Sequence, residues 1–164
     1  LGIVGLGNIG KEVAKRAIGL GMKVIAFDPF VTSTDLEVEL VSKNDLLQRS
    51  DIISLHLPKM KGEPPAIASS EFAQMKKGVV LINCARGGVV SEKDLLDALN
   101  NGTVSAAGID VFENEPPTEA QMELINHPRV SVTPHIGAST IEAQERVGLE
   151  IAQKVVDALS QFQK

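Results

Sequence analysis

The sequence has very few aromatic residues and a single cysteine. Of its 164 residues 3% are aromatic, with neither Trp nor Tyr, while 43% are hydrophobic. The core must therefore be built mainly from aliphatic side chains, as is usual for buried parallel strands. Cys84 has no second cysteine with which to form an internal disulfide, which favours a reducing compartment and a cytoplasmic protein.

The chain also lacks the features of nucleic-acid-binding and membrane proteins. Its formal net charge is −5, so no excess of basic residues favours a nucleic acid as partner. No apolar run approaches the roughly 20 residues of a membrane span, and no signal peptide precedes the first motif. We therefore expect a soluble protein that binds neither nucleic acids nor membranes, and we predict no metal site.

The first 28 residues combine a glycine motif with an acidic residue. An apolar run, Gly2–Val4, leads into Gly5-x-Gly7-x-x-Gly10; a helical pattern follows, and the next apolar run ends at Asp28. In a dinucleotide-binding βαβ unit Gly5 allows a tight turn, Gly7 lets the backbone approach a pyrophosphate, and Gly10 lets helix and strand pack closely. The helix N-terminus attracts the phosphates, and the acidic residue accepts hydrogen bonds from the ribose. Asp28 should also repel a 2′-phosphate, which favours NAD over NADP.

The same residues also fit the start of a nucleoside-triphosphate P-loop. Gly5 to Lys11 match G-x-x-x-x-G-K, but the next position, which should hold Ser or Thr for magnesium, is Glu12. We expect this carboxylate to fall in the first helical turn and to repel a triphosphate. The dinucleotide interpretation is favoured because it alone also uses Asp28.

Apolar runs alternate with helical patterns along almost the whole chain. Strands are predicted at Gly2–Val4, Lys23–Phe27, Val38–Val41, Ile52–His56, Val79–Asn83, Ser105–Asp110 and Val130–Thr133. Helices are predicted at Asn8–Leu20, Asn44–Gln48, Glu71–Met75, Glu92–Leu99, Thr118–Ile125 and Thr140–Phe162. This alternation predicts an α/β fold of the Rossmann type, a doubly wound parallel sheet with helices on both faces.

Ligands of open α/β sheets bind at the carboxyl ends of the strands, where several polar residues stand in this sequence. These residues are Asp28, His56, Cys84, Arg86, Asp110, Glu115 and His135. Arg86 precedes two glycines and could bind a substrate carboxylate, although an isolated arginine is more often a surface residue. His135 could move a proton between an alcohol and a ketone, or could have a structural role at the strand end.

Two carboxylates could pair with this histidine, Glu113 and Glu115, and the residues alone do not choose between them. Such a pair raises the pKa of the imidazole and fixes its tautomer, which suits a general acid and base. Asp110 could approach the nicotinamide side of a cofactor cleft or could cap a turn. We expect His56 to line the cleft and Cys84 to pack near the cofactor rather than act as a nucleophile.

Taken together, the motifs resemble those of the NAD-dependent D-isomer-specific 2-hydroxyacid dehydrogenases, and within them the members that oxidise phosphoglycerate. The resemblance runs through Gly5–Gly10, Asn83–Val90, Gly108–Pro117, Thr133–Thr140 and Glu142–Arg146. It implies hydride transfer between NAD and a D-2-hydroxy acid, with 3-phosphoglycerate as the expected substrate and a place in serine biosynthesis. It further implies that Arg86 binds the substrate carboxylate and that His135 is the acid and base. Glu115, which immediately precedes Pro116, would then be the partner of the histidine.

The resemblance also implies which residues bind NAD. They are Gly5, Gly7, Asn8, Ile9, Gly10, Asp28, His56, Leu57, Pro58, Cys84, Ala85, Arg86, Asp110, His135 and Gly137. One segment departs from the family pattern, which usually continues Leu-Thr-Pro-Glu-Thr after His-Leu-Pro. Here Lys59–Pro65 reads Lys-Met-Lys-Gly-Glu-Pro-Pro, which predicts a surface loop.

The chain begins at Leu1, without an initiator methionine and inside a predicted strand. We therefore expect residues 1–164 to be the NAD-binding domain of a two-domain dehydrogenase, with Thr140–Phe162 as the helix that leads towards the substrate domain. Such a fragment should bind NAD and turn over little or nothing. The resemblance implies a homodimer or larger assembly for the whole enzyme. A non-enzymatic, NAD-sensing corepressor is the alternative, because corepressors share these motifs.

Overall fold

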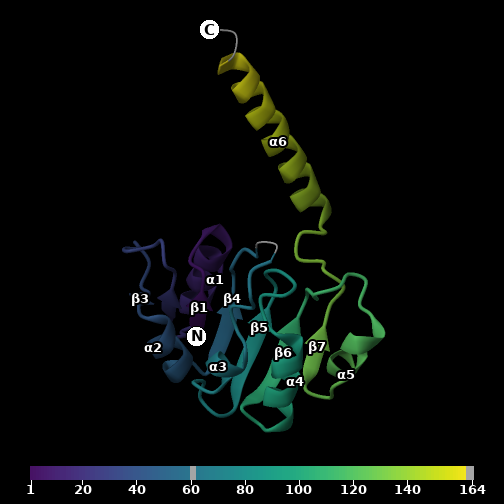
Figure 1. The fold of residues 1–164 in the computed structure, drawn as a ribbon. Helices are drawn as coiled ribbons and strands as arrows, with labels where there is room; N and C mark the ends of the chain where they lie inside the picture. Colours follow the sequence, from purple (N-terminus) through teal and green to yellow (C-terminus); the bar gives the residue numbers. More distant parts are fainter. Residues whose placement is uncertain (60–61, 162–164) are drawn as a thin grey trace. The chain divides into compact units, whose positions relative to one another are not determined.

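The computed structural model describes residues 1–59 and 62–161. The chain forms two compact units, residues 1–134 and 135–164. The first unit contains a seven-stranded parallel sheet in the order β3-β2-β1-β4-β5-β6-β7 (Figure 1). The strands are β1 (Gly2–Val4), β2 (Ile25–Phe27), β3 (Glu39–Leu40), β4 (Ile52–Leu55), β5 (Val79–Asn83), β6 (Val104–Ile109) and β7 (Val130–Val132).

The helices of the first unit cover both faces of this sheet. They are α1 (Asn8–Gly19), α2 (Lys43–Arg49), α3 (Ser69–Phe72), α4 (Glu92–Asn100) and α5 (Met122–Ile125). Successive side chains of a strand point to opposite faces. Accordingly, Ile3 of β1 packs in a cluster with Ala14 and Ala17 of α1, while the next residue, Val4, belongs to a larger cluster that includes residues of α2 to α5. The doubly wound α/β fold predicted from the sequence is confirmed.

The strand order reverses around β1, which pairs with β2 on one side and with β4 on the other. The chain runs from β1 outward to β2 and β3, and α2 then returns it to β4. In open α/β sheets a ligand binds at such a reversal, outside the carboxyl ends of the strands. Gly5, Asp28 and His56 directly follow the ends of these three central strands.

Most predicted boundaries agree with the structure, and the larger differences have local causes. α3 spans Ser69–Phe72 rather than the predicted Glu71–Met75, because the side chain of Glu71 accepts the Ala68 N–H at 3.1 Å and caps an earlier start, and the last predicted residues form a turn. The helix predicted at Thr118–Ile125 is instead a 3-10 turn, Glu119–Gln121, followed by α5. The side chain of Gln121 accepts the Thr118 N–H at 2.8 Å, which tightens this first turn.

The second unit contains one helix, α6 (Ile141–Gln161). Thr140 caps it, since its hydroxyl accepts the Ala143 N–H at 3.1 Å. Ile141, Ile151, Val155 and Leu159 recur along α6 at helical spacing and are exposed. The predicted end of this helix at Phe162 lies outside the described residues.

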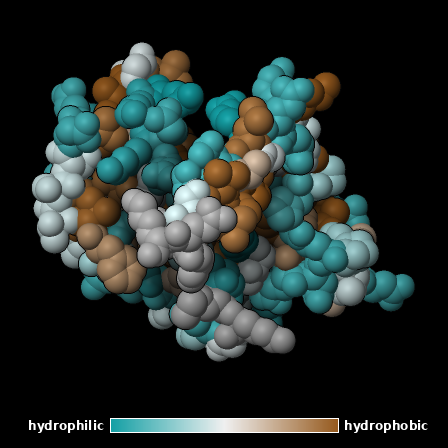
Figure 2. All heavy atoms as spheres, turned by 90° about the horizontal axis from the view of Figure 1, so that it is seen from above, coloured by the Kyte–Doolittle hydropathy of each residue, from teal (hydrophilic) through white to brown (hydrophobic). Residues whose placement is uncertain are grey.

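The surface mixes polar and apolar groups. Hydrophilic residues predominate on the face drawn in Figure 2, with apolar residues interspersed among them. In the first unit Ile9, Leu20 and Phe30 are exposed. Across residues 1–59 and 62–161, no helix has both the length and the apolar character needed to span a membrane.

Candidate functional site

The three glycines between β1 and α1 stand in different surroundings. Gly5 has a φ of 95°, and a Cβ on it would lie 2.6 Å from the carbonyl oxygen of His56. A Cβ on Gly10 would lie 2.1 Å from the carbonyl oxygen of Gly5. A Cβ on Gly7, by contrast, would meet no atom within 4 Å. Gly5 and Gly10 are therefore needed for packing of the turn, whereas Gly7 keeps clear the space beside the helix N-terminus, where a pyrophosphate fits.

The N-terminus of α1 has no acidic residue in its first turn, and no side chain caps it. Glu12 lies further along the helix, where its carboxylate pairs with Lys15 at 2.8 Å and Arg16 at 2.6 Å. The prediction that Glu12 stands in the first turn and repels a phosphate there is wrong. The absence of Ser or Thr after Lys11 still argues against a P-loop.

Asp28 connects the end of β2 to the glycine turn. Its Oδ2 accepts the backbone N–H of Leu6 at 2.8 Å, and its Oδ1 accepts that of Phe30 at 2.9 Å. Each carboxylate oxygen has a second lone pair that can accept a hydrogen bond from a hydroxyl group of a ribose. Open space beside Gly7, an uncapped helix N-terminus and this carboxylate together fit a dinucleotide.

His56 follows β4 beside the same turn. Its backbone N–H donates to the carbonyl oxygen of Val4 at 2.8 Å, and its Nε2 lies 2.9 Å from the hydroxyl of Ser54. Burial lowers the pKa of His56, which favours a neutral ring. A neutral, half-buried imidazole suits the predicted position along the cofactor better than a role in proton transfer.

The loop that departs from the family pattern begins directly after Leu57 and Pro58. Lys59 donates hydrogen bonds from Nζ to the carbonyl oxygens of Glu63 and Pro64, the latter at 3.0 Å. The loop is therefore closed by one lysine side chain. Its Met60 and Lys61 lie outside the described residues.

A short turn after β5 carries Cys84, Ala85 and Arg86. The exposed guanidinium of Arg86 donates from Nη1 to the carbonyl oxygen of Ala85 at 2.6 Å, and its other N–H groups can bind a carboxylate. Burial raises the pKa of the Cys84 thiol, and the negative charge of Asp110 raises it further. A thiol held in its protonated form is a poor nucleophile. Cys84 is exposed in the structure, so its packing near the cofactor stays a prediction.

The segment after β6 is folded tightly around its acidic residues. Asp110 is buried, its N–H donates to the carbonyl oxygen of Asn83 at 3.0 Å, and its carboxylate accepts the hydroxyl of Thr133. Further along, Glu115 accepts the backbone N–H of Phe112 at 3.1 Å through Oε1. Asp110 is thus fixed at the sheet, and Glu115 closes a turn of its own.

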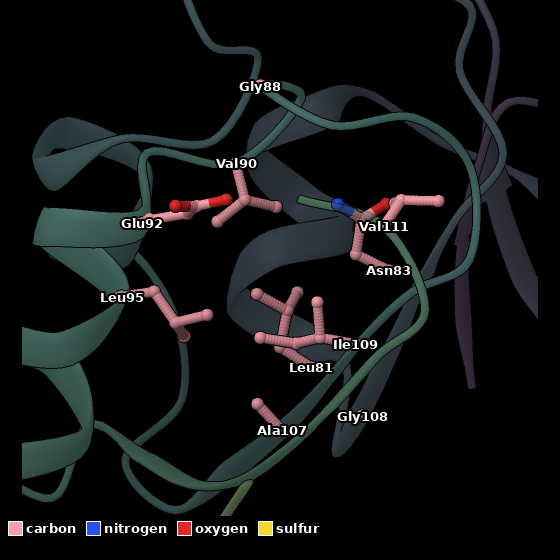
Figure 3. Close-up of a pocket in the computed structure, with 10 residues that line it drawn as sticks. All are labelled: Leu81, Asn83, Gly88, Val90, Glu92, Leu95, Ala107, Gly108, Ile109 and Val111. Atoms are coloured by element: carbon pink, nitrogen blue, oxygen red, sulfur yellow. The ribbon is translucent and has the colours of Figure 1, made fainter. Parts of the chain in front are cut away.

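A small cavity of about 10 Å³ lies behind the Arg86 turn, between β5, β6 and α4. Figure 3 shows Asn83 and Glu92 on opposite sides of it, with Leu81, Leu95 and Ile109 forming its apolar part. Glu92 accepts the backbone N–H of Glu113 through Oε1 at 2.7 Å. Burial raises the pKa of the Glu92 carboxyl group.

His135 is the first residue of the second unit and follows the end of β7 by three residues. Its φ of 55° is the only positive φ of a non-glycine residue in the described part of the chain. Gly137 belongs to the same unit. The pairing of His135 with Glu115, and the contacts of His135 and Gly137 with a cofactor, stay predictions.

Two residues that shape this end of the sheet are not among those predicted from the sequence. Asn83 is buried and forms hydrogen bonds to the backbone of Ala85 and Arg86. A polar residue at the end of an apolar run was the signal that could have indicated it. Glu92 stands at the first position of a predicted helix, where an acidic residue is common, so nothing in the sequence distinguishes it. Within the described residues, no group of three or more His, Cys, Asp and Glu side chains could hold a metal ion.

The sheet, the glycine turn and Asp28 define a Rossmann-type dinucleotide-binding domain. Residues 1–137 match the family described as D-isomer specific 2-hydroxyacid dehydrogenase, NAD binding domain. The chain therefore belongs to the D-isomer-specific 2-hydroxyacid dehydrogenases, and its cofactor is NAD.

Similar proteins include several dehydrogenases and reductases. The chain is 50% identical over 160 residues to a hydroxypyruvate reductase of Thermotoga maritima, and the aligned region covers 97% of this chain and 52% of that protein. It is 47% identical over 163 residues to a D-3-phosphoglycerate dehydrogenase of Mycobacterium tuberculosis, and this alignment covers 98% of this chain and 30% of that protein. The solved D-lactate dehydrogenase of Aquifex aeolicus, complexed with NAD and lactic acid, matches with a TM-score of 0.86 at 37% identity, with 98% and 53% covered. The chain thus spans about half or less of the length of these proteins.

Proposed function

We propose that this domain is the cofactor-binding part of an enzyme that interconverts a D-2-hydroxy acid and the corresponding 2-oxo acid, with 3-phosphoglycerate as the substrate. The observation that supports this most strongly is the contact between the Arg86 turn and the segment of Glu115. A Cβ on Gly87 would lie 1.8 Å from the carbonyl oxygen of Phe112, so the two backbones touch. A cation suited to a carboxylate and an acidic residue suited to a histidine therefore stand on adjoining segments.

The residues for the cofactor follow the ends of the central strands. The N-terminus of α1 and the open space beside Gly7 would hold the pyrophosphate, and Asp28 the adenosine ribose. His56 to Pro58 and Cys84 to Ala85 would line the remainder of the dinucleotide. NAD, when bound, accepts the hydride that leaves C2 of the hydroxy acid.

The reacting groups of the protein would be Arg86, His135 and Glu115. Arg86 would bind the substrate carboxylate with two parallel hydrogen bonds and so orient C2 and its oxygen. His135 would take the proton of the 2-hydroxyl group during oxidation and return it during reduction. Glu115 would hold the imidazole and stabilise its protonated form. Oxidation thus removes one hydride and one proton, which leaves the 2-oxo acid.

The similarity to a D-3-phosphoglycerate dehydrogenase supports 3-phosphoglycerate as the substrate, and the similarity to a hydroxypyruvate reductase makes hydroxypyruvate its main competitor. With 3-phosphoglycerate the enzyme would act in serine biosynthesis in the cytoplasm, as a homodimer or larger assembly. Residues 1–164 alone should bind NAD and turn over little.

The test is an assay of the full-length protein with NADH and four 2-oxo acids: 3-phosphohydroxypyruvate, hydroxypyruvate, glyoxylate and pyruvate. We expect the highest kcat/KM for 3-phosphohydroxypyruvate. The variant His135→Gln should lower kcat by about 100-fold or more while NADH affinity falls by a much smaller factor. His127→Gln is the matched control, because this histidine lies in a loop, where it accepts the backbone N–H of Arg129 at 3.2 Å.

Two outcomes would contradict the proposal. Wild-type turnover by His135→Gln would show that another group moves the proton. A full-length protein that binds NADH and reduces none of the four acids would instead be the NAD-sensing regulator considered from the sequence.

A further inference from the structure

Asn83, the last residue of β5, is one of the few buried polar residues of the described chain, with 5% of its surface exposed. Its side chain has partners on both sides of the carboxamide. Oδ1 accepts the backbone N–H of Ala85, and Nδ2 donates to the carbonyl oxygen of Arg86, each at 3.2 Å. The carboxamide therefore spans the turn and fixes the direction in which the backbone arrives at Arg86.

The backbone of Asn83 is in turn anchored to the sheet. Asn83 pairs with Ile109 in the parallel ladder between β5 and β6, and its carbonyl oxygen accepts the N–H of Asp110 at 3.0 Å. Its side chain lines the cavity behind the turn, as that of Val111 does (Figure 3). Because Asn83 is anchored in the sheet, its side chain can hold the Arg86 turn in place.

Apart from Asn83, the backbone N–H of Val89 also donates to the carbonyl oxygen of Arg86, at 3.4 Å. The side chain of Arg86 is exposed, and the hydrogen bond of its guanidinium goes to Ala85, the residue directly before it. Such a local bond moves with the turn and cannot fix the turn to the sheet. Beyond Arg86, Gly87 touches the carbonyl of Phe112. The direction of Arg86 thus depends on Asn83 before it, which makes the shorter bond to its carbonyl oxygen, and on Gly87 and Val89 after it.

We infer that Asn83 is a positioning residue, which aims Arg86 at the carboxylate of the substrate. The inference rests on the proposed function, in which Arg86 binds that carboxylate. Asparagine is suited to this position because it accepts from Ala85 and donates to Arg86 at the same time. Aspartate lacks the donor, and serine can serve only part of the span.

The test compares Asn83→Ser, Asn83→Asp, Arg86→Gln and the double variant Asn83→Ser/Arg86→Gln in the full-length enzyme. We expect each Asn83 variant to raise the KM for the 2-oxo acid by about tenfold, because loss of either hydrogen bond lets Arg86 turn away. The affinity for NADH, measured by calorimetry, should fall by a smaller factor than the KM rises, because Cys84 and Ala85 line only part of the proposed cofactor site. In the Arg86→Gln background, Asn83→Ser should raise KM no further, because the residue that Asn83 positions is already lost.

The matched control is Asn44→Ala, which removes an exposed amide on α2 and should leave KM unchanged. If Asn83→Asp does not fold, Asn83→Ser decides, since it buries no charge. An unchanged KM for Asn83→Ser beside a raised KM for Arg86→Gln overturns this inference alone. An equal rise of KM in both backgrounds also overturns it, because Asn83 then acts independently of Arg86. An unchanged KM for Arg86→Gln itself contradicts the proposed function instead.

Discussion

Gly87 lies directly against the carbonyl group of Phe112. A Cβ at position 87 would stand 1.8 Å from the oxygen and 2.5 Å from the carbon of that carbonyl, distances that no side chain can adopt. The φ of Gly87 is not among the positive values, so glycine is required here by the contact and not by the backbone conformation. The turn of Arg86 and the segment of Glu115 are thereby held in one fixed arrangement.

Gly87→Ala should separate these two segments and destabilise the domain. Forcing an extra methyl group into a packed contact costs about 1–3 kcal/mol. We expect a fall of several degrees in the Tm of residues 1–164, followed by far-UV circular dichroism because the chain has no Trp. In the full-length enzyme the same variant should raise the KM for the 2-oxo acid, since Arg86 is displaced.

Gly19→Ala provides the control for this substitution. Gly19 is the last residue of α1, and a Cβ on it would meet no atom within 4 Å. Its Tm should equal that of the wild type or exceed it slightly, because alanine favours a helix. A Gly87→Ala protein that is as stable as the Gly19→Ala protein would refute the contact with Phe112.

Gly7→Ala should affect binding and leave stability alone. Gly7 has a φ of −73°, which any residue can adopt, and the space around its Cβ is open. The methyl group would occupy only the space assigned to the pyrophosphate. We expect an unchanged Tm and an NADH dissociation constant about tenfold or more higher by calorimetry. Gly10→Ala should instead lower the Tm, because its Cβ would press on the carbonyl group of Gly5. If the Gly7→Ala protein binds NADH normally, the pyrophosphate does not lie beside Gly7.

The sequence predicted the order of strands and helices because buried parallel strands are nearly continuous apolar runs, such as Val79–Asn83. The dinucleotide site was predictable for a similar reason, since the glycine turn and Asp28 keep a fixed order along the chain. The motif also predicts a separate role for each glycine, the tight turn for Gly5, the pyrophosphate for Gly7 and close packing for Gly10. What the sequence could not provide is the atoms involved, such as the His56 carbonyl oxygen against Gly5, because they lie far away in the chain.

The contacts that fix the Arg86 turn could not be predicted. Asn83 and Glu92 act through hydrogen bonds from side chain to backbone, which leave no periodic pattern in the sequence. The error for Glu12 is of another kind: a helix that begins at Asn8, as the sequence itself predicts, already has Glu12 beyond its first turn. Composition and spacing therefore predict elements better than they predict the side chains that align them.

Asp28→Asn should weaken the binding of NADH and reduce the preference of the protein for NADH over NADPH. A carboxylate repels the 2′-phosphate of NADPH, and a neutral amide does not. The amide also places its NH₂ group opposite one of the backbone N–H groups that Asp28 now binds, those of Leu6 and Phe30, so part of the turn is lost. We expect the ratio of the two dissociation constants to fall by about tenfold.

Calorimetric titration of NADH and NADPH into the same protein measures this ratio. Asp35→Asn is the charge-matched control, because Asp35 is an exposed carboxylate in the connection between β2 and β3. It should change neither dissociation constant. An Asp28→Asn protein with the wild-type ratio would show that another residue selects NAD.

Glu92→Gln should stabilise the domain increasingly as pH rises. Burial raises the pKa of Glu92 above its ordinary value of 4.5; hydrogen bonds from the Glu113 N–H and the Gln121 side chain partly oppose this, and the charge of Glu113 adds a smaller rise. Between the ordinary and the raised pKa the folded state holds more protons on this group than the unfolded state, so stability falls as pH rises through that window. The Glu113 N–H now donates to Oε1 of Glu92 at 2.7 Å. Glutamine at position 92 keeps an oxygen that can accept this hydrogen bond, and it has no charge to bury.

The Tm of Glu92→Gln and of the wild type, measured by circular dichroism from acidic to neutral pH, tests this sign. Below the ordinary pKa the two curves should lie close together, because Glu92 is then protonated in both the folded and the unfolded state. Above the raised pKa the variant should melt about 1–2 °C higher and the gap should stay constant. Glu37→Gln, a change at an exposed glutamate, removes the same charge from the chain and should give a curve parallel to that of the wild type. A gap that is independent of pH, or one that closes towards neutral pH, would mean that the buried carboxyl group carries no cost in the folded state.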